Sequence, residues 1–278
     1  MAETASINKP KDLIEAVPEE VSKIVLPSMT EEKTEEKSEE AVEVKFKEMD
    51  KKERRERREI EDAKRAIAAW VPKTELGRAV KEGKIKSIDE VLLSGKKILE
   101  GEITESLVNL ESDLLLIGQA KGKFGGGKRR AWRQTQKKTM EGNVVTFSCM
   151  AVVGDRKGHV GLGYGKAKET LPSRAKALRN AKLNIMKITL GFETKEEKSA
   201  TPHTVPFVVE GKCGSIRIKL IPAPRGTGLV IGDEGKKVLR LAGVQDVYAV
   251  TKGQTRTTFN VAKAIILALE KTNTKVLI

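Results

Sequence analysis

Residues 143–187 read NVVTFSCMAVVGDRKGHVGLGYGKAKETLPSRAKALRNAKLNIMK. In 143–153 apolar side chains recur at every second position, the period of a β-strand with one face in the core: Val145, Phe147, Cys149, Ala151 and Val153. Thr146 and Ser148 point to the opposite face. Residues 154–158 form a turn into a second strand, 159–166, in which Val160, Leu162 and Tyr164 alternate with glycine. The stretch predicts an antiparallel pair of strands.

After the second strand the apolar period becomes helical. The predicted apolar stripe, with Pro172 in the first turn, consists of Leu171, Ala175, Leu178, Ala181 and Ile185. The basic residues lie off this stripe: Arg174, Lys176, Arg179 and Lys182. A helix that packs on a sheet and turns cations outward suits phosphate, and its N-terminal dipole adds to the attraction. The alternative is a solvated basic helix of the kind found on many soluble domains.

The charge of the chain is divided unevenly. It has 278 residues, 38% hydrophobic and 4% aromatic, and a net charge of +14. Residues 1–50 contain seven lysines and fourteen acids, so residues 51–278 carry +21. This size and composition favour two small domains, and a balance this basic indicates nucleic acid or an anionic membrane surface as partner. No apolar run reaches membrane-spanning length and the N-terminus does not resemble a secretory signal, so we expect a cytosolic protein.

Metal and disulfide chemistry are not expected. Cys149 and Cys213 lie in apolar strand patterns, and His159 and His203 show no ligand spacing with them. Both thiols are predicted to be buried as small hydrophobic groups. No Ser/His/Asp constellation is readable either. We therefore expect neither a metal nor another cofactor.

Residues 1–117 are predicted to contain a disordered tail followed by helical segments. Residues 1–49 include the run TEEKTEEKSEE and predict a disordered acidic tail. Residues 50–70 predict an exposed charged helix, which either lies on RNA or is a salt-bridged solvent helix. Residues 70–101 contain short amphipathic turns, and 102–117 predict a helix that buries Ile103, Leu107, Leu110, Leu114 and Ile117 on one side.

Residues 118–140 are the strongest single indication of nucleic-acid binding, because they contain eight cations and no acid: Lys121, Lys123, Lys128, Arg129, Arg130, Arg133, Lys137 and Lys138. Phe124 and Trp132 would be able to stack on bases beside these cations. The alternative is a pliable basic loop without a ligand. A strand that begins near Trp132 is expected to form a hairpin through residues 141–143 into the first strand described above.

A second α+β pattern follows a polar linker at 193–200. Strands are predicted at 203–210 and 215–221, with Ile216, Ile218 and Leu220 inward and Arg217 and Lys219 outward. A helix at 233–242 ends at Gly243, a strand spans 244–251, and a last helix at 258–271 uses Phe259, Ala262, Ile265, Ile266 and Leu269 for the core.

Two glycine-rich stretches resemble nucleotide-binding motifs. Residues 161–166 lack the first glycine of a phosphate loop, because that position is Val160. Residues 226–232 lie between a strand and a helix, and Asp246 follows twenty residues after Gly226, as in a dinucleotide-binding fingerprint. The third glycine comes one position late, however, and only about 75 residues remain for such a sheet. A nucleotide-using enzyme is thus an alternative hypothesis.

Several short motifs resemble the universal small-subunit ribosomal protein five family: GHVGLGYGKAKE at 158–169, PHTVP at 202–206, GKCGS at 211–215 and LIPAPRGTG at 220–228. WVPKTELGR at 70–78 and KIKSIDEV at 84–91 resemble its archaeal and eukaryotic branch. The resemblance covers residues 70 to the end. Residues 118–133 are longer and more basic than the family pattern, and the acidic tail lies outside it.

The resemblance implies an N-terminal domain similar to a double-stranded-RNA-binding fold (α-β-β-β-α) and a C-terminal ββαβα domain with a left-handed βαβ crossover, against the usual handedness. It also implies binding to small-subunit rRNA, contact with the neighbouring small-subunit ribosomal protein four, and support of translational accuracy near the path by which mRNA enters. The loop around Lys137, Lys138, Glu141 and Gly142 matches the decoding-side loop, and 163–168 match an RNA-facing strand end.

We therefore predict a non-enzymatic ribosomal α+β protein, located on ribosomes in the cytoplasm, that binds no membrane and no small-molecule substrate. The predicted divisions are a tail (1–49), a helical extension (50–101), a double-stranded-RNA-binding-like domain (102–192) and a C-terminal ribosomal protein five domain (201–278). A free-standing regulator of double-stranded RNA is a further alternative. The predicted rRNA-binding residues are those named in 118–140, with Trp132, the four helix cations, and Lys157, Lys166, Lys168 and Arg225.

Overall fold

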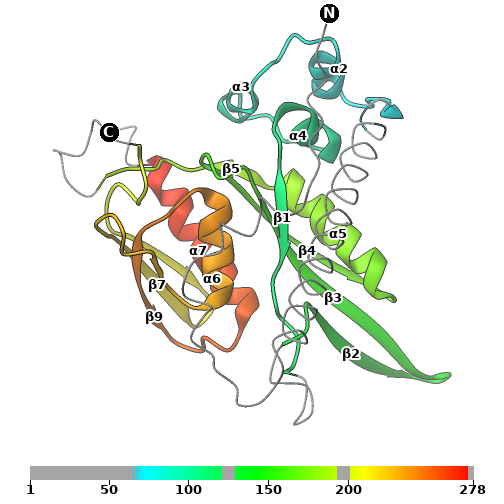
Figure 1. Ribbon diagram of the computed structural model, residues 1–278. Helices are drawn as coiled ribbons and strands as arrows, with labels where there is room; N and C mark the ends of the chain where they lie inside the picture. Colours follow the sequence, from blue (N-terminus) through cyan, green and yellow to red (C-terminus); the bar gives the residue numbers. More distant parts are fainter. Residues whose placement is uncertain (1–64, 66, 68, 121–128, 193–200, 275–278) are drawn as a thin grey trace, which may run out of the picture. The chain divides into compact units, whose positions relative to one another are not determined.

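The computed structural model describes residues 65, 67, 69–120, 129–192 and 201–274 (Figure 1). All the elements described below belong to one compact unit, Ile67–Ile278. The predicted acidic tail, most of the predicted helix at 50–70, residues 121–128 and the linker at 193–200 lie outside the described residues.

The first sheet is built around a long central strand. Among the described residues it has five strands: β1 (Glu111–Leu114), β2 (Trp132–Thr139), β3 (Gly142–Gly154), β4 (His159–Ala167) and β5 (Ile185–Lys187). All the pairs are antiparallel, in the order β1-β3-β4-β5. β2 pairs with the first part of β3 and β1 with its last part, along the same edge. The predicted strands and the hairpin from Trp132 into β3 are confirmed.

The helix predicted at 102–117 is wrong beyond its first half. α4 (Gly101–Leu107) ends where Val108 takes an extended backbone, with φ −137° and ψ 137°. β1 follows, and Leu115 then donates its N–H to the carbonyl of Met150 at 3.0 Å. Leu115 and Ile117 are buried. The spacing of Leu107, Leu110, Leu114 and Ile117 matched a helix, but pairing with β3 satisfies the backbone as a strand. The sheet consequently contains β1 and β5 in addition to the three strands predicted.

The apolar stripe predicted for the next helix is correct only in part: the helix, α5 (Thr170–Leu183), is present, Ala181 is buried and Leu178 packs against the core. Its buried residues are Ser173, Ala177 and Ala181, whereas Leu171 is 72% exposed. Ala175 is exposed too, and Ile185 belongs to β5. The reason lies in β4: a Cβ atom added at Gly163 would lie 2.1 Å from the carbonyl oxygen of Ala177. The helix comes so close to the glycines of β4 that only small side chains fit between them.

β3 is buried on both faces over its second half, and not on one face as predicted. On one face Cys149 and Ala151 pack against Ala177 of α5. On the other face Met150 and Val152 belong to a larger hydrophobic cluster that includes Val238 and Leu239. The core of the first sheet is therefore continuous with that of the second sheet.

The second sheet has the order β6-β7-β9-β8: β6 (Val209–Cys213), β7 (Ile216–Pro222), β8 (Leu229–Val230) and β9 (Val247–Lys252). β8 and β9 are parallel and are joined by α6 (Asp233–Ala242), so they form a βαβ unit. α7 (Thr258–Thr274) lies beside α6 (Figure 1).

Most predictions for this region are confirmed. α6 has the predicted bounds and ends at Gly243, which has φ 92°. In β7, Ile216, Ile218 and Leu220 are buried while Arg217 and Lys219 are exposed. Three corrections apply. β6 begins at Val209 because His203 and Thr204 are held by loop contacts with Gly191 and Gln245. The strand predicted at 244–251 begins at Val247, because the N–H groups of residues 244–246 donate to Leu239 and His203. β8 was not predicted. A two-residue strand is too short to show a period.

The segment before the first sheet forms a small cluster of its own. α2 (Glu75–Lys81) and α3 (Ile88–Leu93) pack with α4 around Val80, Val91, Ile98 and Ile103. The carboxylate of Glu100 accepts hydrogen bonds from Trp70 Nε1 at 2.8 Å and from the N–H groups of Lys73 and Thr74 at 2.9 and 2.7 Å. Burial alone would raise the pKa of Glu100, but these bonds together lower it.

Candidate nucleic-acid interface

Three strands of the first sheet bring two predicted cations to the same level. Arg133 of β2 and Lys166 of β4 both stand opposite Ser148 of β3, one on each side. Directly opposed residues of neighbouring strands point to the same face of a sheet. Arg133 and Lys166 are both exposed, and Ser148 between them is buried. This face therefore presents two positive charges across the width of one strand.

α5 begins at the same end of the sheet but on the other face, because Ser148 shares the two-residue period of Met150 and Val152 while α5 packs on Cys149 and Ala151. The hydroxyl of Ser173 donates to the carbonyls of Gly165 at 3.0 Å and Phe147 at 3.2 Å, which fixes the first turns of the helix. Arg174 and Lys176 follow this buried serine and are exposed, as is Lys168 just before the helix. The positive end of the helix dipole lies at the same end of α5. Positive charge is therefore present on both faces of this end of the sheet.

The β2–β3 hairpin extends the basic surface away from α5 (Figure 1). Lys137 and Lys138 stand opposite Val144 and Asn143 near its tip and are exposed. Arg129 and Arg130, which precede β2, are exposed as well. Trp132 is half-buried against Cys149, Ala151 and Ala177, so its ring contributes to the core more than to a stacking surface.

Four predicted residues lie apart from this region or are already engaged. Lys157 is exposed in the turn between β3 and β4, at the opposite end of those strands. Lys182 pairs with Glu105 of α4. The stem of Arg179 faces Gly101. Arg225 belongs to the second sheet's loop, where its Nη2 donates to the carbonyl of Thr201 at 2.8 Å. Lys121, Lys123 and Lys128 lie outside the described residues.

Most of the predicted cations that the structure describes form no ion pair with a described acid. Of the predicted cations in the described part of the chain, Lys182 alone forms an ion pair. Exposed arginines and lysines without carboxylate partners can neutralise phosphates and release condensed counterions. The geometry therefore suits polyanion contacts along the hairpin and on both faces of the adjoining end of the sheet, at Arg133 and Lys166 on one face and at the first turns of α5 on the other.

Sequence analysis did not predict a cluster of hydrogen-bonded charged side chains around His159. Its Nδ1 lies 2.6 Å from Asp155 Oδ2 and its Nε2 lies 3.0 Å from Asp89 Oδ1. The hydrogen bond with Asp155 raises the pKa of His159 although burial opposes it, and Asp89 adds to the increase. The pKa of Asp89 is lowered mainly by its hydrogen bond from Lys187 and next by its hydrogen bond with His159. The cluster ties α3 to the first sheet, so His159 has a structural role. Its partners are 4 and 70 residues away in sequence, and only the nearer spacing was open to sequence analysis.

The glycine-rich stretch at 226–232 does not form a nucleotide site of the kind its spacing suggested. The Asp246 carboxylate is buried and fully occupied: Oδ1 accepts the N–H of Gly228 at 2.7 Å, and Oδ2 lies 2.9 Å from His203 Nδ1. It is therefore not available to a ribose hydroxyl. No group of His, Cys, Asp and Glu in the described ranges could hold a metal ion, and no described helix is long and apolar enough to cross a bilayer.

The fold and the surface define a class of protein: a basic α+β protein with two sheets and a cation-rich face suited to nucleic acid. Comparison with known proteins identifies the family. Ribosomal protein S5, N-terminal domain, matches residues 131–189, and Ribosomal protein S5, C-terminal domain, matches residues 211–277. The small ribosomal subunit protein uS5 of Nanoarchaeum equitans is 46% identical over 206 residues, which are 74% of this chain and 88% of the relative.

Two further relatives agree. The uS5 proteins of Aeropyrum pernix and Methanospirillum hungatei are each 45% identical, over 74% and 73% of this chain and 88% and 93% of their own lengths. The chain belongs to the uS5 family of small ribosomal subunit proteins. Membership confirms the predicted family, and with it a ribosomal, RNA-binding protein of the cytoplasm that is not an enzyme.

Proposed function

We propose that this chain is a structural constituent of the small ribosomal subunit that binds small-subunit rRNA, contacts the neighbouring small-subunit ribosomal protein four and supports translational accuracy near the path by which mRNA enters. The observation that carries the proposal is the group of unpaired cations around one end of the first sheet: Arg133, Lys166, Lys168, Arg174 and Lys176. The hairpin with Lys137 and Lys138 is proposed to be the decoding-side loop.

Sedimentation tests the ribosomal assignment. In a gradient of cell lysate the protein should travel almost entirely with the small subunit and with whole ribosomes. A free-standing regulator of double-stranded RNA, the alternative, would leave most of the protein at the top of the gradient. That distribution would reject the ribosomal role and favour the alternative.

The salt dependence of rRNA binding tests the interface. Each neutralised phosphate contributes about −0.7 to −0.9 to the slope of log affinity against log salt. The eight cations of 118–140 should supply a large part of this slope. If half of them engage, replacing all eight by glutamine should flatten it by about three units. Stability should hardly change, because the five that the structure describes are exposed.

A second variant separates the loop from the helix. Arg174→Gln with Lys176→Gln removes two exposed charges beside Ser173 while the serine keeps its hydrogen bonds to the sheet. We expect a slope reduced by about 1.4 to 1.8 units. An unaltered slope in both variants would reject the proposed interface.

The open face of the second sheet supports the proposed contact with protein four. Lys212, Arg217 and Lys252 stand opposite one another across β6, β7 and β9. Further along the same face, Tyr248 and Val250 are 41% and 46% exposed. A patch of apolar groups beside cations suits a protein partner with an acidic rim. Arg217→Ala should therefore weaken binding to purified protein four, measured by calorimetry, and leave the fold intact. Equal affinity of the variant and the wild type would contradict this assignment.

The finer fold features are part of the proposal. We propose that residues 102–192 form a domain similar to the double-stranded-RNA-binding fold, and that β8, α6 and β9 in 201–278 have a left-handed crossover. The proposed boundary between the domains is 193–200. Limited proteolysis should cut there first and leave two resistant fragments. A first cut inside either domain would reject the boundary.

A further inference from the structure

Residues 70–107, which contain α2, α3 and α4, form a helical segment that is largely self-contained (Figure 1). Of the described residues in its apolar cluster, Leu183 of α5 is the one that comes from outside the segment. The carboxylate of Glu100, just before α4, binds Trp70 and Thr74 at the beginning of the segment. The segment therefore has the internal contacts needed to move as one unit.

Ion pairs attach this segment to the first sheet and α5. The acids lie on the segment and the bases on the sheet and α5. Asp89 of α3 accepts from Lys187 Nζ of β5 at 2.8 Å and lies 3.0 Å from His159 Nε2. Glu105 of α4 pairs with Lys182 of α5. Because contacts of this kind depend on protonation and are screened by salt, the attachment of the segment depends on both.

Both ring nitrogens of His159 face carboxylates. Nδ1 lies 2.6 Å from Asp155 Oδ2, and Nε2 lies 3.0 Å from Asp89 Oδ1. A neutral imidazole has one N–H and can donate to one of the two acids, whereas the imidazolium donates to both. The arrangement therefore requires a protonated His159, and the raised pKa of this residue agrees.

Loss of the proton affects the two acids unequally. Asp155 is fixed in the β3–β4 turn, because its Oδ1 accepts the N–H groups of Lys157 and His159 at 2.8 and 3.0 Å. Its side chain is 6% exposed, whereas that of Asp89 is 38% exposed. The remaining N–H consequently stays with Asp155, and the lone pair of Nε2 then faces Asp89. A contact that held α3 on the sheet becomes repulsive.

The other charges around His159 do not replace this contact. Lys187, directly opposite His159 in β5, keeps its bond to Asp89, but the two side chains are 46% and 38% exposed and such pairs contribute little. The charged residues of the neighbouring elements have other partners or are exposed: Arg156 (paired with Glu111), Lys157 (exposed), Glu90 (bonded to Ser87), Lys237 (bonded to the carbonyl of Leu114) and Lys271 (bonded to the carbonyl of Glu210).

We propose that the helical segment is a pH- and salt-dependent latch, which is closed on the first sheet while His159 is protonated and opens as a unit when His159 is neutral. The hinge is residues 108–110, where α4 has ended, Val108 is extended and β1 has not yet begun. The contacts of α4 with α5 persist in part, so the change is a shift of population between closed and open forms. It is a property of the free protein and does not depend on the proposed rRNA binding.

A pair of spin labels measures the opening in the full-length protein. Leu93→Cys on α3 and Leu171→Cys on α5 carry the labels, because these leucines are 83% and 72% exposed. Cys213 is replaced by serine, and Cys149 is buried. Double electron–electron resonance should give one distance population at pH 6. At pH 9 a second population should appear, with its ratio to the first raised about tenfold or more, because a hydrogen bond between charged groups is lost. High salt at pH 9 should raise this ratio further.

Two variants and a matched control locate the switch. Asp89→Asn removes the acid of α3 and should show the second population at pH 6 as well as at pH 9. His159→Gln is neutral at both pH values and should show no pH dependence. Asp113→Asn is the control, because Asp113 is a half-exposed acid outside the segment, 3.8 Å from Lys237 of α6. It should keep the pH dependence of the wild type.

Three results would overturn the latch. The first is a wild-type distance distribution that is the same at pH 6 and pH 9. The second is an Asp89→Asn variant that stays closed at pH 6. The third comes from a second label pair, Leu171→Cys with Leu267→Cys, which joins α5 to α7 and leaves the segment out. If this pair changes with pH in parallel with the first, the whole fold loosens and the segment does not open as a unit.

Discussion

α5 and α6 each pack on the first sheet, yet they do so with opposite kinds of residue. α5 meets β4 through Ser173, Ala177 and Ala181, which lie over glycines. α6 lies against β1, β3 and β4 and buries Val238, Leu239, Leu241 and Ala242 in the large cluster. The first contact depends on close backbone approach and the second on apolar volume. An apolar stripe is therefore a good guide to α6 and a poor one to α5.

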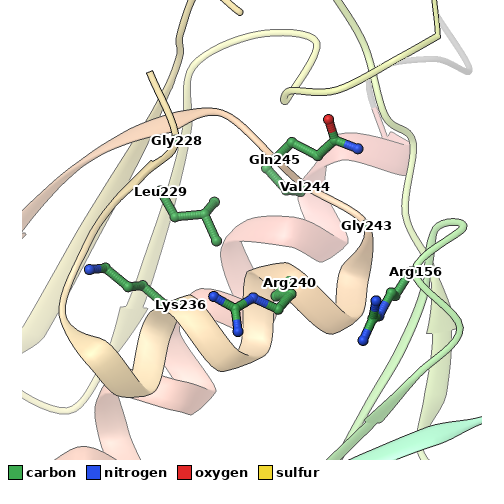
Figure 2. A pocket seen from close by; sticks show the side chains of 8 residues that line it. All are labelled: Arg156, Gly228, Leu229, Lys236, Arg240, Gly243, Val244 and Gln245. Carbon is green, nitrogen blue, oxygen red and sulfur yellow. The ribbon is translucent and has the colours of Figure 1, made fainter. Parts of the chain in front are cut away.

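The difference also explains where the cations can lie. Because the fully buried residues of α5 are small, the helix leaves much of its circumference to solvent, including Leu171. Arg174, Lys176 and Arg179 occupy that exposed part. α6 is wedged between the first sheet and α7. Its Lys237 donates to the carbonyl of Leu114 at 2.9 Å, while Lys236 and Arg240 line a hollow of about 480 Å³ at its exposed edge (Figure 2). The packing mode thus determines whether a helix presents a broad charged surface or a narrow charged rim.

The largest effect is expected where α5 comes closest to β4. In Gly163→Ala the new Cβ would lie 2.1 Å from the carbonyl oxygen of Ala177 and 2.2 Å from the N of Ala181. Both are backbone atoms, so the whole helix must move. We expect a loss of about 4–5 kcal/mol in the free energy of unfolding, measured by urea denaturation.

Gly101→Ala is the matched control for this substitution. Its Cβ would meet Lys182 at 3.7 Å, an ordinary contact, in the first turn of α4. Its effect should stay within about 0.5 kcal/mol. Similar stabilities of the Gly163 and Gly101 variants would mean that α5 does not need the glycines.

The second prediction concerns apolar volume in the other sheet. Ile218 is 1% exposed and belongs to the large cluster. Ile218→Ala should cost about 2–5 kcal/mol of unfolding free energy, because it removes apolar contacts and leaves a cavity. Arg217→Ala, one position along on the exposed face, should change stability by about 0.5 kcal/mol or less. A loss below that limit for Ile218→Ala would contradict the assignment of faces.

The fold could be predicted wherever one element supplied its own signal. α6 shows both an apolar stripe and a terminal glycine at Gly243, and its bounds were predicted correctly. β7 alternates cleanly and was correct to within a residue. The errors fell where long-range contacts decide. Residues 111–114 become strand β1 because β3 offers an edge, and the second face of β3 is buried because α6 covers it.

The candidate site was predicted in part for the same reason. Exposed cations such as Arg133, Lys166 and Arg174 follow from local pattern, since each lies opposite a buried residue or beside one. The pairing of Lys182 with Glu105 could not be predicted from local pattern, because the two residues are 77 positions apart in the sequence. Arg156 and Arg240, which are 84 positions apart, line the same hollow only because of tertiary packing, and no sequence spacing predicts it.

The third prediction is a pH dependence at the edge of the first sheet away from the hairpin. The pKa of His159 is raised above its ordinary value of about 6.5, so its contribution is fully present below that pH and is lost as the pH rises through the raised pKa. His159→Gln should cost about 1–2 kcal/mol of unfolding free energy at pH 6. At pH 9 the gap between wild type and variant should be smaller, as measured from urea midpoints.

The acids of the same cluster act in the opposite direction. Hydrogen bonds lower the pKa of Asp155 against the effect of its burial, and the pKa of Asp89 is lowered as well. Their contribution is present above about pH 4 and is lost as the pH falls through the lowered values. The cluster should therefore stabilise the protein most between about pH 4 and 6.5. A gap between wild type and His159→Gln that does not change from pH 6 to pH 9 would contradict a charged His159.

The smallest effect is expected at Leu171, which the sequence analysis wrongly predicted to be buried. Leu171 heads the predicted stripe but is 72% exposed in the first turn of α5, whereas Ala177 and Ala181 are fully buried. Leu171→Ser should change the free energy of unfolding by about 0.5 kcal/mol or less, because no packed contact is lost. Ala177→Leu, which adds volume on the buried face, should cost about 1–3 kcal/mol. If Leu171→Ser were the more damaging of the two in urea denaturation, α5 would be rotated to bury the leucine. Large side chains would then have to make the contact of α5 with β4, as they make the contact of α6 with the first sheet.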